Sequence, residues 1–296
     1  MTALLVSFFN LTTTVPSAFP LGQKTHNMKH TLLTLLLLCS ALISRAQCAI
    51  PNTAFMAGEK LSYELYFNWK FVWVKAGTAT FSTTATEYEG KTAFRSHLIT
   101  RTSSTLDRFF CMRDTLEGII TSDNVPLYYR KGAYEGKKYR LDEVWYSYPD
   151  GHTHLKQAYR NPAGKVTHGQ RDIKDCVYDM ITMMQRARSF DISQFEKNKR
   201  MHFWMADGDE VLDEVLVYRG KETVKQEHSN VKFRCLVFSF IERVDGKDKE
   251  IVKFFISDDA NHMPVRLDLN LKFGTAKAYL SNYSGLRNPV TSIVKK

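Results

Sequence analysis

The chain has 296 residues, of which 44% are hydrophobic and 12% aromatic, enough to build a substantial core and to exclude disorder over most of its length. Its formal net charge is +10, from 41 Lys and Arg against 31 Asp and Glu. The basic residues form no run of the length that nucleic-acid tails have, so we expect no nucleic-acid partner and a weak preference for anionic surfaces.

A secretory signal peptide is the clearest feature near the N-terminus. Residues 28–46 start with Met-Lys-His, continue through an apolar stretch and end in Ser44-Arg45-Ala46, which is the order basic, apolar, small-x-small. The apolar stretch is shorter than the roughly 20 residues that span a bilayer, so we expect no transmembrane segment in the mature chain. Because Met28 directly precedes the basic residues, we interpret residues 1–27 as a mis-annotated upstream leader. An unusually long leader from Met1 is the alternative.

Export sets the expected compartment and the state of the cysteines. Removal of residues 1–46 leaves 38 basic and 31 acidic residues, a net charge of +7, in a chain expected in the periplasm. A lipid anchor on Cys48 is the alternative, although Gln47 rather than a small residue precedes it. Cys48, Cys111, Cys176 and Cys235 remain, which allows three disulfide connectivities and, equally, buried free thiols.

Strand patterns dominate after residue 58. Leu61, Tyr63 and Leu65 alternate with less apolar residues, which predicts a first strand, and we interpret the run 69–77 as its continuation, with Gly77 at a bend or bulge. Turn sequences at residues 149–151 and 161–164 follow at short spacing. This spacing is typical of an antiparallel meander.

The period changes once, between residues 172 and 189. Val177, Ile181 and Met184 stand at i, i+4 and i+7, the spacing of an amphipathic helix. We predict one substantial helix at about residues 175–188, with Asp175 as its N-cap or first-turn acid.

Strands resume after the helix, with turns at residues 207–210 and 245–246 and a loop at 257–262. Because a long meander must hide its edges, we predict a mainly β fold in which the meander curls into an open or spiral barrel. The expected organisation is an N-terminal tail at 47–57, one β-rich domain at 58–285 and a loose C-terminal tail at 286–296.

Several loose motifs in a fixed order resemble an exported bacterial family, domain of unknown function 3108, in its Bacteroides type. The motifs are Ala57-Gly-Glu-Lys-Leu-Ser-Tyr63, Lys75-Ala-Gly77, Asp175-x-x-Tyr-Asp179, Phe255-Ile-Ser-Asp-Asp-Ala-Asn-His-Met-Pro-Val265 and Gly274-x-Ala-x-Ala-x-Leu280. The resemblance covers most of residues 55–285 and implies no established activity. The curled β architecture that we predict is itself similar to that of lipoprotein carriers, a likeness of fold that does not establish function. Asp179 departs from the family's pattern, because a small residue is common at that position.

Aromatic side chains are the leading candidates for ligand binding. An apolar groove inside an open barrel would bind a lipid, an acyl chain or another envelope component, and core packing is the competing interpretation. The candidates are Trp69, Phe71, Trp73, Trp145 and Trp204. The first three share one face if their strand is regular.

Asp172, Asp175 and Asp179 form an acidic cluster around the predicted helix start. Paired carboxylates can perform general acid–base chemistry, but acidic residues also stabilise a helix N-terminus, and we favour the structural role. The sequence contains no nucleophile elbow, no zinc-protease motif and no phosphate-binding glycine loop, so we expect no catalytic residues and no cofactor.

His152 and His154 share one strand face, and His168 lies nearby in the sequence. Three histidines can hold a metal ion, but we favour a solvated face and expect no metal. Cys111 lies in the apolar run 109–112 and is expected in the core, without a catalytic partner.

The sequence therefore predicts a non-enzymatic cell-envelope protein that binds a lipid, an acyl chain or another apolar ligand in the concave face of a curled sheet. A hydrolase of envelope polysaccharide or peptidoglycan is one alternative. A structural or assembly partner that uses an exposed sheet edge is the other. The oligomeric state is not predicted.

Overall fold

The computed structural model describes residues 48–294, apart from 70–71, 227–229, 245 and 272–273. The interpretations of residues 1–46 therefore fall outside the described residues. None of the helices in the described part has the length and hydropathy to cross a bilayer.

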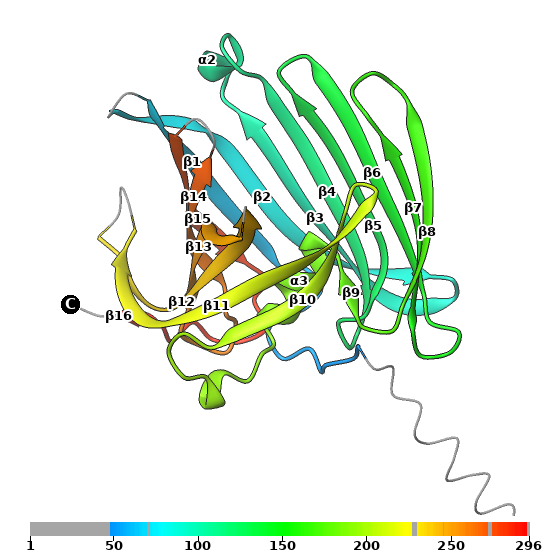
Figure 1. Cartoon of the computed structure of the whole chain (residues 1–296). Helices are drawn as coiled ribbons and strands as arrows, with labels where there is room; N and C mark the ends of the chain where they lie inside the picture. Colours follow the sequence, from blue (N-terminus) through cyan, green and yellow to red (C-terminus); the bar gives the residue numbers. More distant parts are fainter. Residues whose placement is uncertain (1–47, 70–71, 227–229, 245, 272–273, 295–296) are drawn as a thin grey trace, which may run out of the picture. The chain divides into compact units, whose positions relative to one another are not determined.

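One long sheet runs through the fold, mostly as an antiparallel meander (Figure 1). Its first half comprises β1 (Lys60–Trp69), β2 (Val72–Tyr88), β3 (Lys91–Thr102), β4 (Met112–Thr121), β5 (Pro126–Glu135), β6 (Lys138–Ser147), β7 (Thr153–Arg160) and β8 (Val166–Ile173). Its second half comprises β9 (Val177–Tyr178), β10 (Arg200–Asp207), β11 (Glu210–Lys225), β12 (Lys232–Val244), β13 (Lys247–Ser257), β14 (Pro264–Leu271), β15 (Gly274–Ser284) and β16 (Ile293–Val294). The short helices are α2 (Ser104–Asp107), α3 (Met180–Ala187) and the 3-10 turn η1 (Ile192–Gln194).

The two halves of the sheet join where β1 pairs with β15, so the strand order is 8-7-6-5-4-3-2-1-15-14-13-12-11-10-9. The sheet curls into a nearly closed barrel, and one unsealed seam separates β8 from β9 and β10. The predicted class, a mainly β meander curled into an open barrel, is confirmed.

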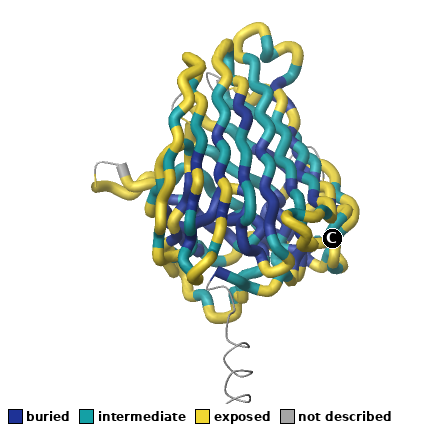
Figure 2. Tube along the Cα trace, turned by 90° about the vertical axis from the view of Figure 1, so that its right-hand side faces the viewer, coloured by how far each residue is buried: buried dark blue, intermediate teal, exposed yellow. Residues whose placement is uncertain are grey.

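The core lies toward one end of the barrel, beside α3. Ile181 of α3 packs in a cluster with Leu61, Leu116 and Tyr129, which project from the concave side of β1, β4 and β5. Figure 2 shows buried residues concentrated at this end, while the opposite ends of the strands are partly or fully exposed.

A buried ion pair fixes the C-terminal end of α3. The Arg188 guanidinium donates to both carboxylate oxygens of Glu59, at 2.6 and 2.7 Å, and also to the Asn261 carbonyl oxygen. Both charged side chains are almost fully buried, so each depends on the other for its solvation. The pair ties α3 to the segment before β1 and to the loop between β13 and β14.

The helix begins later than predicted. Val177 and Tyr178 form β9, which pairs in parallel with β10, and Asp179 rather than Asp175 caps the helix. The helical period at Val177 was misleading because that residue is buried in the core as a strand residue.

The first predicted strand is also wrong in one respect, because β1 ends at Trp69 and β2 begins at Val72. The run 69–77 therefore belongs to two strands. The bulge expected at Gly77 is confirmed, since the β1–β2 register shifts there. A Cβ at Gly77 would lie 2.0 Å from the Arg101 carbonyl oxygen, which explains the glycine.

Both predicted tails are packed against the barrel. In the N-terminal segment Cys48 is disulfide-bonded, and Ala54 and Phe55 are fully buried. At the other end β16 pairs with β12, and Ser292 is buried with its hydroxyl donating to Asp259. The expectation of a loose C-terminal tail is therefore wrong over residues 286–294, because apolar residues there cover the outer face of β12.

Candidate ligand site at the seam

Side chains, rather than a backbone ladder, close the seam at one end. Arg171 of β8 donates to the Asp209 carbonyl oxygen at 2.6 Å. Gln157 of β7 donates to the carbonyl oxygens of Gly208 and Glu210 at 3.1 and 3.2 Å. The Thr167 hydroxyl of β8 also donates to the Asp209 carboxylate, at 3.5 Å. Side chains of β7 and β8 therefore hold the turn between β10 and β11.

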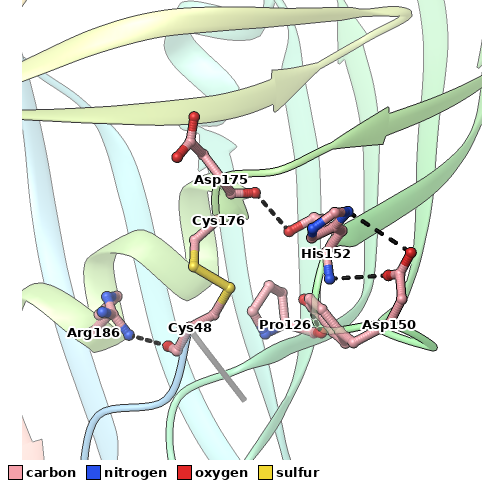
Figure 3. Close-up of a disulfide and its surroundings, with 9 residues drawn as sticks. Cys48, Pro126, Asp150, His152, Asp175, Cys176 and Arg186 are labelled. Carbon is pink, nitrogen blue, oxygen red and sulfur yellow. Dashed lines mark hydrogen bonds and ion pairs between the residues drawn. A yellow bond between two sulfur atoms is a disulfide. The ribbon is translucent and has the colours of Figure 1, made fainter.

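At the other end of the seam, a disulfide anchors the connection between β8 and β9 to the N-terminal segment. Cys48 and Cys176 are joined, and the Arg186 guanidinium donates to the Cys48 carbonyl oxygen (Figure 3). The Thr153 hydroxyl donates to the Asp175 carbonyl oxygen at 2.8 Å, which links β7 to the segment before β9. Cys111 and Cys235 are free, so the four cysteines combine the two alternatives that the sequence left open, one disulfide and two free thiols.

Two hollows of about 430 Å³ each lie along the seam on either side of Trp204, which lines both. The Trp204 side chain is 37% exposed. The first hollow is lined by Asp175, Cys176, Tyr178, His202, Phe203, Trp204 and Asp213. The second is lined by Arg171, Asp172, Ile173, Trp204 and Val211.

The lining combines apolar walls with an acidic border. Asp172, Asp175 and Asp213 contribute three carboxylates against two basic side chains. Arg171 is engaged with the β10–β11 turn, and the His202 Nδ1 atom lies 3.3 Å from an Asp213 carboxylate oxygen. The seam therefore offers an indole surface for apolar groups and carboxylates for a hydrogen-bond donor or a cation.

The predicted acidic cluster is divided between two environments. Asp172 and Asp175 are exposed at the seam, whereas Asp179 is fully buried as the N-cap of α3. Its carboxylate accepts from the Thr182 backbone N–H at 2.8 Å and from the Thr182 hydroxyl at 2.6 Å. Burial raises the pKa of Asp179 to about 6. Asp179 thus has a structural role, as expected for the acidic cluster, but it is the cap that the sequence placed at Asp175.

One group near the seam brings potential metal ligands together, among the residues that the structure describes. Ligand atoms of Asp150, His154 and Asp172 lie within 4.8 Å of one another. The third histidine, His168, pairs with Ala158 farther along β8, so it does not join His154. A hydrogen bond from His154 lowers the pKa of Asp150, and pairing of His154 with both carboxylates accounts for this arrangement.

Of the five candidate aromatic residues, the structure places Trp204 at the seam. Trp145 alternates with the core residues Val144 and Tyr146, so it faces outward, where its ring lies 5.7 Å from the Tyr128 ring. The Trp73 ring lies 4.5 Å from the Lys277 ammonium. Phe71 and the side chain of Trp69 fall outside the described residues. The three candidates whose side chains are described, Trp73, Trp145 and Trp204, therefore do not line one common groove. A role of the five candidates in ligand binding stays a prediction.

Several lining residues were not singled out from the sequence. Arg171 and Val211 meet at one hollow, and His202 and Asp213 line the other. They come from β8, β10 and β11, and nothing in a local pattern shows that the curled sheet brings these strands together. Asp150 was within reach of sequence reasoning, because it lies four residues before His154 in a turn.

The fold and the seam define a β protein built from one curled sheet, with a candidate ligand site where that sheet fails to close. The family model described as "Protein of unknown function (DUF3108)" matches residues 62–281, and the chain belongs to this family. Among solved structures it is similar to a β-barrel-like protein of the domain of unknown function DUF1849 from Brucella abortus. That similarity has a TM-score of 0.49 and 11% identity, covering 78% of this chain and 98% of the other. No curated protein matches the chain.

Proposed function

We propose that this protein is an exported, non-enzymatic component of the cell envelope that binds an apolar or amphipathic ligand, such as a lipid acyl chain, at the seam. The observation that carries the proposal is the position of Trp204 between two hollows whose walls include Phe203, Ile173 and Val211. Pockets that combine apolar walls with a few polar groups are typical of small-ligand sites.

The seam supports binding better than the concave face that the sequence suggested. Residues from both walls of the barrel meet α3 in one buried cluster, which includes Leu61, Leu155, Ile181 and Leu280. This cluster fills the concave face at the α3 end with the protein's own side chains. We therefore place the ligand at the seam, with the acidic border facing its polar end.

Two features support export to the periplasm. The signal-like sequence at residues 28–46 precedes the described chain. The Cys48–Cys176 disulfide requires an oxidising compartment to form and persist. The same disulfide uses the sulfur atom of Cys48 that a lipid anchor would need, which favours an unanchored protein.

The proposal is tested with the fluorescent apolar probe N-phenyl-1-naphthylamine and its displacement by palmitate. We expect the purified protein to enhance probe fluorescence, and the W204A variant to bind the probe about tenfold or more weakly, since burying an aromatic contact contributes 1–3 kcal/mol. W145A is a matched control, because Trp145 and Trp204 are equally exposed, at 37%.

The outcomes separate the proposal from its alternatives. Equal loss of binding in W204A and W145A, or no probe binding by the intact protein, would overturn it. Native mass spectrometry of protein purified from the envelope adds a second readout, in which a bound lipid mass supports the proposal. A bound peptide mass instead would favour the assembly role, for which β8 provides an eight-residue strand at the edge of the sheet.

The hydrolase alternative finds less support in the acidic residues. Its candidate pair, Asp175 and Asp179, is divided between the exposed seam and the buried cap of α3. A carboxylate that accepts two hydrogen bonds from Thr182 inside the core is not available to a polysaccharide.

A further inference from the structure

The connections between strands at one end of the barrel form a continuous edge. Alternate turns of an antiparallel meander lie at the same end, and Figure 1 shows the β3–β4, β5–β6 and β7–β8 connections along the upper edge. The last described residues of β1 and β14 and the first of β2 and β15 are placed at this end by the strand pairing. Backbone hydrogen bonds join neighbouring connections, from Ser103 to the Ala76 carbonyl oxygen and from Gly136 to the Cys111 carbonyl oxygen. We define this edge, the basic rim, as residues 72–75, 101–114, 134–140, 160–166 and 274–277, together with Leu271.

Large apolar side chains are exposed at the basic rim. Phe109 is 84% exposed and Phe110 is 48% exposed, and Cys111, which was expected in the core, is only partly buried. Nine of the fifteen exposed large hydrophobic residues in the described part of the chain lie here: Val72, Trp73, Val74, Phe109, Phe110, Tyr134, Tyr139, Val166 and Leu271. Such a concentration at one end of a molecule marks an interaction surface.

The positive charge of the mature chain is concentrated in the same place. The basic rim contains ten Lys and Arg residues and three acidic residues, a net charge of +7. The rest of residues 47–296 is neutral, with 28 basic and 28 acidic residues. Two of the three acids are paired within the rim, Asp107 with Arg113 and Glu135 with Arg140, which leaves exposed cations such as Lys137 and Lys138 to define the surface charge.

We propose that the basic rim docks onto an anionic lipid bilayer surface. Lys and Arg residues near a membrane are attracted to anionic headgroups, while aromatic side chains such as those of Phe109 and Trp73 insert at the level where headgroups meet acyl chains. A protein partner would need an acidic surface with an apolar centre, whereas an anionic bilayer offers both over a broad plane. The inference uses residues separate from the seam and does not depend on the proposed ligand.

The test is co-sedimentation of the purified protein with vesicles of phosphatidylcholine alone or of phosphatidylcholine mixed with phosphatidylglycerol. We expect binding to the mixed vesicles, little binding to phosphatidylcholine alone, and weakening by added salt. F109S/F110S removes the exposed aromatic rings, and K137E/K138E reverses two exposed charges. Each double variant should bind the mixed vesicles about tenfold or more weakly.

Matched controls keep the proposal falsifiable. K60E/K91E reverses two exposed lysines at the opposite end of β1 and β3 and should bind like the unaltered protein. W204A, which alters the proposed ligand site, is measured alongside to distinguish the seam from the basic rim. Circular dichroism of every variant checks folding. Absence of binding to the mixed vesicles by the unaltered protein, or an equal loss in K60E/K91E, would overturn the proposal. Loss of vesicle binding in W204A alone would assign lipid contact to the seam instead.

Discussion

Asp179 shows how burial determines the role of a single carboxyl group. The sequence placed it in an acidic cluster with Asp172 and Asp175, and Asp175 was the expected helix cap. In the structure Asp179 is enclosed in the core, close to Tyr129 and Tyr146, and burial raises the pKa of both tyrosines as well. Local sequence pattern identified a helix cap in this region but could not tell which aspartate the sheet would enclose.

The raised pKa of Asp179 predicts a pH dependence of stability. The folded state binds this proton more tightly than the unfolded state, whose pKa is about 4. The contribution from Asp179 is therefore fully present below about pH 4 and is lost as the pH rises through about 6. We expect D179N, which keeps an oxygen acceptor for the Thr182 N–H, to remove a dependence on the order of 2–3 kcal/mol between pH 4 and 7. Urea denaturation across this range measures it.

D179A provides the comparison for that experiment. It removes the cap as well as the titrating group, so the free energy of unfolding should fall by about 0.5–2 kcal/mol relative to D179N at every pH. If D179N retains the pH dependence of the unaltered protein, another group is responsible. Glu214 is then the next candidate, since burial raises its pKa to about 7.

At the scale of elements, α3 approaches β4 closely because Gly118 has no side chain. A Cβ atom at this position would lie 2.6 Å from the Ile181 Cγ2 atom, which is closer than atoms pack. The glycine thus sets how deeply α3 enters the barrel, and its place in β4 reflects this contact rather than a turn.

We expect G118A to lower the free energy of unfolding by about 1–3 kcal/mol, because the Ile181 side chain must move inside a packed core. In a double-mutant cycle, G118A should cost less in an I181A background than in the unaltered protein, because alanine lacks the Cγ2 atom that lies 2.6 Å from the added Cβ. G169A on β8 is the control, because the nearest atom to its added Cβ is 3.9 Å away. Equal losses in G118A and G169A would contradict the packing argument, and urea denaturation gives the comparison.

The elements were predictable to different degrees. Alternation identified most strands, and Gly-containing turns such as 207–210 and 161–164 ended them where expected. The boundary between β1 and β2 was missed, because residues 69–74 contain no Gly, Pro, Asp or Asn that would indicate a turn. The start of α3 was placed too early, because a two-residue strand leaves no periodic signal of its own.

At the scale of the whole molecule, the curled meander followed from strand density, whereas the seam did not. Sequence reasoning favoured binding in the concave face because a barrel interior is where a ligand is usually enclosed. Which strands meet across the seam depends on the accumulated twist and register of the whole sheet. Trp204 was identified from its residue type, but its neighbours Arg171 and Val211 could be known only from the closed geometry.

The Cys48–Cys176 disulfide is expected to stabilise the whole domain, because it joins residues 128 positions apart. We expect C48S/C176S to lower the free energy of unfolding by about 2–5 kcal/mol, measured by urea denaturation. Adding a reductant to the unaltered protein should give the same loss. C111S, which alters a free cysteine, should leave the urea midpoint of unfolding unchanged. A similar loss of stability in C111S would argue against a specific stabilising role of the disulfide.

The pairing of β1 with β15 has a consequence for how the protein folds. Its partners, from Lys60 with Ser284 to Phe67 with Ala276, are separated by more than 200 residues, whereas the other long strands pair mainly with sequence neighbours. If the chain folds as it is synthesised from its N-terminus, β1 to β8 can pair with one another first. The other edge of β1 then stays unpaired until β15 has been made. Closing so long a loop is entropically costly, so this joint is expected to form late and to limit the folding rate. Until then the unfinished edge is open to association with other chains.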